Sequence, residues 1–84
     1  MHDLHAANRI LKKVLEFGAS KKLTKITDIH VDLGTVIEHG EEISPDNFRF
    51  NLEQLSQGTI AEGASVHLEK KSDSYIKLVK IIGE

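Results

Sequence analysis

The absence of cysteine most limits how this chain can fold, because it removes the cross-links on which many small domains depend. Disulfides, thiolate zinc sites, iron–sulfur clusters and cysteine nucleophiles are excluded, so any bound metal must be held by nitrogen and oxygen. The 84 residues suffice for one domain, and a chain of this length buries roughly 60 to 65% of its unfolded surface. One modest hydrophobic core must therefore hold the fold together.

Apolar periodicity in the first part of the chain predicts a helix and then a strand. The apolar side chains at helical spacing are Leu4, Ala7, Ile10, Leu11, Val14 and Leu15. Asp3 is expected as the N-cap, and Gly18 is expected to end the helix or to lie in its last turn. Strict alternation follows, with Ile29, Val31 and Leu33 separated by His30 and Asp32. This alternation predicts a half-buried strand from about residue 25 to residue 33.

The second part of the chain predicts a loop, a helix and two strands. The polar and acidic residues 34–43 are expected to form an exposed loop. Ser44 and Pro45 fit the N-cap and first position of a helix, which Gly58 is expected to close. Its core-facing residues are Phe48, Leu52 and Leu55. Strands are expected around residues 66–69 and over residues 75–82, with a turn at residues 71–74 between them.

The order of the elements, helix, strand, helix, strand and strand, predicts an α+β fold. We expect two helices packed on one face of a small three-stranded sheet, in a single domain that spans residues 1–84. The net charge of −2 gives no electrostatic reason to bind nucleic acid. The longest apolar run falls far short of the roughly 20 residues that cross a bilayer, and the N-terminus does not resemble a signal peptide. A cytoplasmic protein without nucleic-acid or membrane partners is expected.

The first three residues, Met1, His2 and Asp3, form a candidate chelate for a square-planar metal ion. The amine of Met1, the backbone nitrogens of His2 and Asp3, and Nδ1 of the His2 ring can surround one ion in a plane. Four coplanar nitrogens suit Ni(II) or Cu(II), whereas zinc favours a tetrahedron and magnesium or calcium favours oxygen ligands. A solvated, frayed terminus is the competing interpretation of the same residues.

Two motifs carry a family resemblance. The chain opens with Met-His, an acidic residue and an amphipathic helix, and Phe48-Arg49-Phe50 leads through Leu55 into the run Gly58-Thr59-Ile60-Ala61-Glu62-Gly63-Ala64. Both motifs resemble the nickel-binding domain of the HypA family, the small metallochaperones that help to load nickel into NiFe-hydrogenases. The resemblance implies Ni(II) as the bound metal, with His2 as the indispensable side chain of the terminal site. It also implies a hydrogenase maturation GTPase and the hydrogenase large subunit as partners.

The chain departs from the family pattern in three places. Members normally carry a zinc domain with two Cys-x-x-Cys pairs between the last two strands, where this chain has only residues 70–74, so no structural zinc is expected. A short hairpin is expected to join the two strands instead. Asp3 stands where Glu is frequent. The loop after Gly34 is longer than usual, with Thr35 where an acidic residue is common.

The remaining histidines are further candidate ligands. His5 lies one turn from His2 and His39 lies in the acidic loop, so both are auxiliary candidates for the terminal site. His30 and His67 fall on the polar faces of neighbouring candidate strands, where a cross-strand pair can bind a divalent ion or can simply be solvated. No nucleophile and base have the spacing of a catalytic pair. The run from Gly58 to Ala64 lacks the Gly-Lys-Ser/Thr ending of a phosphate loop, so it is interpreted as a structural turn.

The sequence therefore predicts a nickel-binding accessory protein for hydrogenase maturation that has no catalytic activity. The alternative is an interaction or regulatory module that has the same fold but carries no metal.

Overall fold

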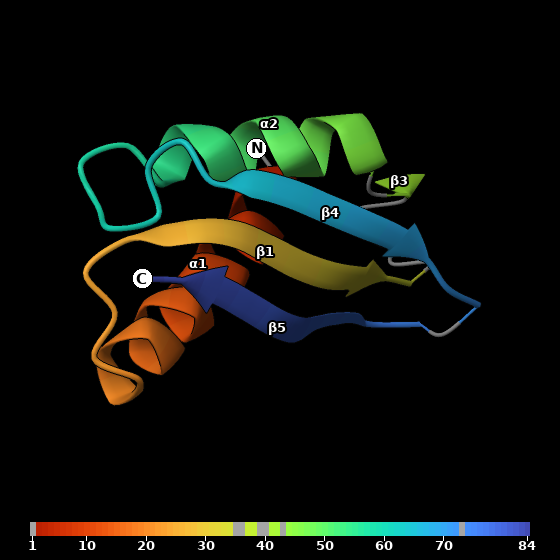
Figure 1. Cartoon of the computed structure of the whole chain (residues 1–84). Coiled ribbons are helices and arrows are strands. Elements are labelled where there is room, and N and C mark those ends of the chain that lie inside the picture. Colours follow the sequence, from red (N-terminus) through yellow and green to blue (C-terminus); the bar gives the residue numbers. More distant parts are fainter. Residues whose placement is uncertain (1, 35–36, 39–40, 43, 73) are drawn as a thin grey trace.

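The computed structural model describes residues 2–34, 37–38, 41–42, 44–72 and 74–84, and for residues 2–5, 37–38 and 41–42 it describes the backbone only. The elements in chain order are α1 (His2–Ser20), β1 (Ile26–Leu33), β2 (Ile37–Glu38), β3 (Glu41–Glu42), α2 (Pro45–Leu55), β4 (Ser65–Lys70) and β5 (Ile76–Gly83). Figure 1 shows both helices on one face of the sheet formed by β1, β4 and β5. The predicted α+β fold is confirmed.

One apolar stripe fixes the position of α1. The buried apolar side chains described in this helix, none more than 7% exposed, are Ala6, Ala7, Ile10, Leu11 and Val14. They face the sheet and α2, and α1 packs against α2 and β5. The helix begins at His2, so Asp3 lies within its first turn, and the prediction of Asp3 as the N-cap is wrong. An acidic residue is favourable at either position, so the sequence does not separate them.

Strand β1 is the centre of the sheet, whose order is β4-β1-β5. It pairs in parallel with β4 and antiparallel with β5. The predicted hairpin between β4 and β5 is therefore wrong, because β1 lies between them. The connecting segment crosses the C-terminal end of β1, where the Lys71 amide donates to the Leu33 carbonyl (3.0 Å) and the Gly34 amide donates to the Tyr75 carbonyl (3.1 Å). The segment is short because β4 ends and β5 begins at the same end of the sheet (Figure 1).

Part of the acidic segment after β1 is also a ladder and not only a loop. Strands β2 and β3 form a two-stranded antiparallel pair, in which Ile37 faces Glu42 and Glu38 faces Glu41. The expectation of an exposed loop over residues 34–43 was based on polarity and missed this pair. Backbone hydrogen bonds form a ladder whatever the side chains, so a polar sequence does not exclude one. Residues 35, 36, 39, 40 and 43 lie outside the described part of the chain.

The start of α2 follows the sequence prediction. Ser44 is the N-cap and its hydroxyl accepts from the Asn47 amide (3.5 Å), while Pro45 takes the first helical position. Phe48 and Leu52 are fully buried, and Leu55 packs against the same core. The end differs from the prediction, because the helix stops at Leu55 with Ser56 as its C-cap.

The segment after α2 is a compact turn that leads into β4. Gly58 and Gly63 both have positive φ, +82° and +79°. The Gly58 amide donates to Oε1 of Glu62 (2.7 Å), and the Thr59 hydroxyl donates to the Ser56 carbonyl (2.6 Å). Ala61 is fully buried beneath it. These contacts agree with the interpretation of this run as a structural turn.

The core lies between the helices and the inner face of the sheet. Its strand residues, each at most 8% exposed, are Ile26, Ile29, Val31, Leu33, Val66, Leu78 and Ile81. Leu78 and Ile81 are three residues apart because the pairing of β1 with β5 is irregular between His30 and Val31. This irregularity explains the imperfect alternation of β5. Among the described residues, no helix has the length and apolar character needed to cross a membrane.

Candidate metal centre

The predicted terminal site lies at the start of α1. His2, Asp3 and His5 belong to this helix by their backbone, but their side chains lie outside the described part of the structure. Met1 and His39 lie outside it altogether. The Ni(II) site predicted at Met1, His2 and Asp3, with His5 and His39 as auxiliaries, therefore stays a prediction.

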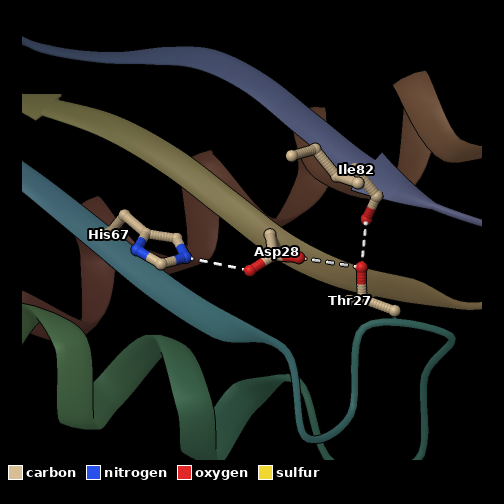
Figure 2. Close-up of polar contacts among 4 residues, drawn as sticks. All are labelled: Thr27, Asp28, His67 and Ile82. Atoms are coloured by element: carbon tan, nitrogen blue, oxygen red, sulfur yellow. Dashed lines mark hydrogen bonds and ion pairs between the residues drawn. The ribbon is translucent and has the colours of Figure 1, made fainter.

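A polar network occupies the other face of the sheet, away from the helices (Figure 2). His67 on β4 lies with Nε2 2.9 Å from Oδ1 of Asp28 on β1. The Thr27 hydroxyl lies 2.9 Å from Oδ2 of Asp28 and 3.2 Å from the carbonyl oxygen of Ile82 on β5. A hydroxyl has one hydrogen, so these two acceptors compete for it. The network thus links all three strands of the sheet.

The carboxylate of Asp28 is held in its charged form. Hydrogen bonds from His67 and then from Thr27 lower the pKa of Asp28 below its ordinary value, and the nearby charges of His67 and His30 act in the same direction. An ionised carboxylate only accepts hydrogen bonds, so the hydrogen of the contact belongs to Nε2 of His67. A neutral His67 ring then has its lone pair on Nδ1.

His30 completes the cluster. It is the direct register partner of His67 across the parallel pair of β1 and β4. The two rings are stacked, with their centroids 4.4 Å apart and their planes inclined by 13°. The prediction that these histidines lie on neighbouring strands is confirmed, and the ring contact goes beyond it.

The histidine pair borders a shallow hollow of about 320 Å³ on the outer face, lined in part by Asp32, Glu69 and Lys80. Asp32 and Glu69 are register partners two positions beyond the histidines, and Lys80 faces His30 from β5. Glu69 also lies 3.2 Å from Nζ of Lys71. In the part of the chain with described side chains, no group of three or more His, Asp or Glu residues is arranged to hold a metal ion.

Asp28 and Thr27 were missed at the sequence level. The spacing of Asp28, His30 and Asp32 places all three on one face of a strand, and this pattern was the available signal for Asp28. Thr27 had no such signal. Thr27 lies at an irregularity in the pairing of β1 with β5, between Ile26 and Asp28. Alternation of side chains alone does not predict such an irregularity.

Comparison with known proteins places the chain in a family. The family described as hydrogenase/urease nickel incorporation, metallochaperone, matches residues 1–75. Among curated proteins, the hydrogenase maturation factor HypA of Archaeoglobus fulgidus is 32% identical over 68 residues, which covers 81% of this chain and 58% of that protein. The HypA proteins of Pyrococcus furiosus and Methanocaldococcus jannaschii are 32% and 31% identical, over 84% and 82% of this chain and 48% and 56% of their own lengths.

This chain thus spans about half the length of the curated relatives it matches. The match nevertheless covers α1, the central strand, α2 and β4, and it ends directly before β5. A match over most of the chain, with the fold that the resemblance implies, shows that the protein belongs to the HypA family of nickel-incorporation metallochaperones.

Proposed function

We propose that this chain carries Ni(II) at its N-terminus and passes the ion to a partner in hydrogenase maturation. The ligands are the Met1 amine, the backbone nitrogens of His2 and Asp3, and Nδ1 of His2. The observation that carries the proposal is that the family match begins at residue 1, so that this triplet lies within the matched region. Such a protein acts as a carrier and not as an enzyme.

The start of α1 suits a backbone chelate. The first four amide groups of an α-helix have no acceptor within the helix, and α1 begins at His2. Deprotonation of the His2 and Asp3 amides therefore breaks no hydrogen bond of the helix. Coplanar chelate rings are not compatible with a helical φ near about −63°. Nickel binding should accordingly unwind the first residues of α1 and leave the buried stripe beyond them in place.

The rest of the proposal follows from the family and, for zinc, from the absence of cysteine. Residues 1–84 form the nickel-binding domain, without structural zinc, and the protein acts in the cytoplasm. Its partners are a maturation GTPase and the large subunit of a hydrogenase. The description of the family also names urease, so a urease is a second target class.

A module that binds a maturation partner without metal is the alternative. Three aromatic side chains favour it, because Phe17, Phe50 and Tyr75 are 49%, 59% and 56% exposed. Exposed aromatic residues are frequent in protein interfaces. They are equally compatible with a nickel carrier that docks on its partner.

A Ni(II) titration followed by visible absorption tests the proposal. It compares the native protein with His2→Ala and with a version that carries three added residues, Gly-Ser-Gly, before Met1. A single added residue is unsuitable, because it makes His2 the third residue and creates another amine, amide and imidazole chelate. His5→Ala is the matched control. Intact mass spectrometry first establishes that Met1 carries a free amine.

A yellow, diamagnetic one-to-one complex is expected for the native protein and for His5→Ala, and its loss is expected for the other two. Equal spectra for all four proteins would overturn the terminal chelate. A hydrogenase maturation assay in cells then separates the two functions. If the extended protein supports maturation as well as the native one, the interaction module is the better account.

A further inference from the structure

We propose a second metal site, on the outer face of the sheet, in which His30 and His67 hold one divalent transition-metal ion through two imidazole nitrogens. Water molecules complete the coordination. The site lies on β1 and β4, outside the N-terminal segment, and it does not depend on the terminal chelate. The orientation of His67, the position of His30 and the nearby carboxylates support this site.

His67 already has the arrangement of a metal ligand. Metal-binding histidines almost always donate their other ring N–H to a carboxylate, a carbonyl or water, which fixes the tautomer and the ring orientation. Here Nε2 donates to Asp28 (2.9 Å), and the second ring nitrogen lies on the far side of the ring from Asp28, toward the C-terminal end of β1 (Figure 2). That nitrogen, Nδ1, carries the free lone pair.

His30 brings the second imidazole. Its ring is stacked on that of His67 with a centroid separation of 4.4 Å. Metal–imidazole bonds are about 2.0–2.1 Å long and lie in the plane of the ring, so the His30 ring must turn out of the stack until a nitrogen of each ring points at a common ion. The outer face leaves room for this side-chain rotation, because the neighbouring His67 side chain is 49% exposed.

Carboxylates and lysines both border the hollow. Asp32 and Glu69 line the side toward which Nδ1 of His67 is directed, and their oxygens can accept hydrogen bonds from metal-bound water. Lys80 faces His30 and Lys77 faces Asp32 from β5, and both oppose the attraction of a cation, while Glu69 is already paired with Lys71. Two protein ligands and the nearby lysines imply a labile site of modest affinity.

The ligand set selects the class of ion. Imidazole suits nickel, cobalt, copper and zinc, whereas magnesium and calcium favour sets made of oxygen. With two imidazoles and several waters, Ni(II) is expected to be octahedral and paramagnetic. A square-planar terminal chelate is instead diamagnetic, so the two sites have different spectroscopic signatures.

The test uses the full chain with His2→Ala and the Gly-Ser-Gly extension, so that the terminal chelate is absent. Nickel chloride is the probe. Proton–nitrogen NMR spectra of the histidine rings are recorded at substoichiometric Ni(II), and calorimetry gives the dissociation constant. His30→Ala and His67→Ala remove one ligand each, and Asp28→Asn weakens the support of His67. His5→Ala removes an imidazole from α1 as the matched control.

Broadening of the His30 and His67 ring signals is expected before that of any other histidine. Each ligand variant should weaken binding by about tenfold or more, Asp28→Asn should weaken it severalfold, and His5→Ala should leave it within twofold. Circular dichroism verifies that each variant is folded, and His30→Gln and His67→Gln replace any alanine variant that is not. Uniform broadening of all histidines, unchanged affinity in either ligand variant, or no binding overturns the site. None of these outcomes bears on the terminal chelate.

Discussion

Asp28 accepts hydrogen bonds from two neighbours on the open face of the sheet, and it is the residue on which the polar network depends. It supports His67 by fixing the hydrogen on Nε2. Asp28 and His67 have register partners in the ladder of the sheet, whereas Thr27 lies at the irregularity between Ile26 and Asp28. The geometry of the network therefore depends on the strand register and on this irregularity.

The lowered pKa of Asp28 makes stability depend on pH. The folded-state pKa lies below the unfolded value of about 3.9. The charged carboxylate therefore contributes stability above that unfolded value, and this contribution disappears as the pH falls through the lower folded pKa. In metal-free buffer, urea unfolding should show wild type more stable than Asp28→Asn at pH 7, with a difference that shrinks at pH 3. Glu53→Gln makes the same charge change away from the network, and an equal pH profile for both variants would contradict the prediction.

Substitutions of Phe48 and Phe50 test how much burial contributes to stability, because one side chain of α2 is buried and the other is exposed. Phe48 is fully buried and Phe50 is 59% exposed. Phe48→Ala should lower the free energy of unfolding by about 3 to 5 kcal/mol, which is enough to unfold many small domains. Phe50→Ala should change it by less than about 1 kcal/mol. Urea titrations of the two variants measure both values, and similar losses would argue against the packing of α2.

At the scale of elements, the helices and main strands followed from periodicity, whereas their spatial order did not. Ile29, Val31 and Leu33 alternate cleanly enough to define β1, and Ser44-Pro45 defines the start of α2. Sequence order suggested a hairpin between β4 and β5, yet β1 separates them. Strand order depends on which apolar faces pack together, and this is a long-range property. The ladder of β2 and β3 was missed because three of its four residues are glutamates.

The candidate site, too, could be predicted from the sequence only in part. The pairing of His30 with His67 followed from the polar faces of two predicted strands. The support from Asp28 and Thr27 did not, since it depends on a local irregularity of the sheet. The terminal triplet is a sequence signal that needs no fold, because all its ligands lie within three consecutive residues.

Gly58 tests the turn between α2 and β4. Its φ of +82° lies in the region that L-residues with a Cβ rarely adopt, although no atom lies near enough to collide with a Cβ there. Gly58→Ala should therefore cost about 1 to 2 kcal/mol through backbone strain alone. Gln57→Ala, at the exposed neighbouring position, should have little effect. Thermal unfolding of the two variants gives the comparison, and an equally stable Gly58→Ala protein would count against this turn conformation.

In the whole molecule the helices cover one face of the sheet and leave the other open. The two proposed metal sites differ in how far they depend on the folded state. Ligands within three consecutive residues come together in the unfolded chain as readily as in the folded protein. His30 and His67 come together only when β1 and β4 pair. Only an ion held by the sheet should therefore stabilise the fold, since stabilisation requires preferential binding to the folded state.

Thermal unfolding with and without Ni(II) tests this difference. With the terminal chelate removed, Ni(II) at about ten times its dissociation constant should stabilise the protein by about 1.4 kcal/mol. In His67→Ala with the native N-terminus, saturating Ni(II) should give no increase in the unfolding temperature. The reverse pattern would place the stabilising ion at the terminus.

The central position of β1 also governs the order in which the protein can acquire its structure. β1 is made before both of its neighbours, and the pair Ile26 and Gly83 joins residues that are far apart in the sequence. Such distant pairings close large loops and form slowly. On the ribosome, β1 must wait with both edges unpaired until β4 and β5 have emerged. The N-terminal residues are therefore exposed to the solvent and its metal ions before the sheet is complete.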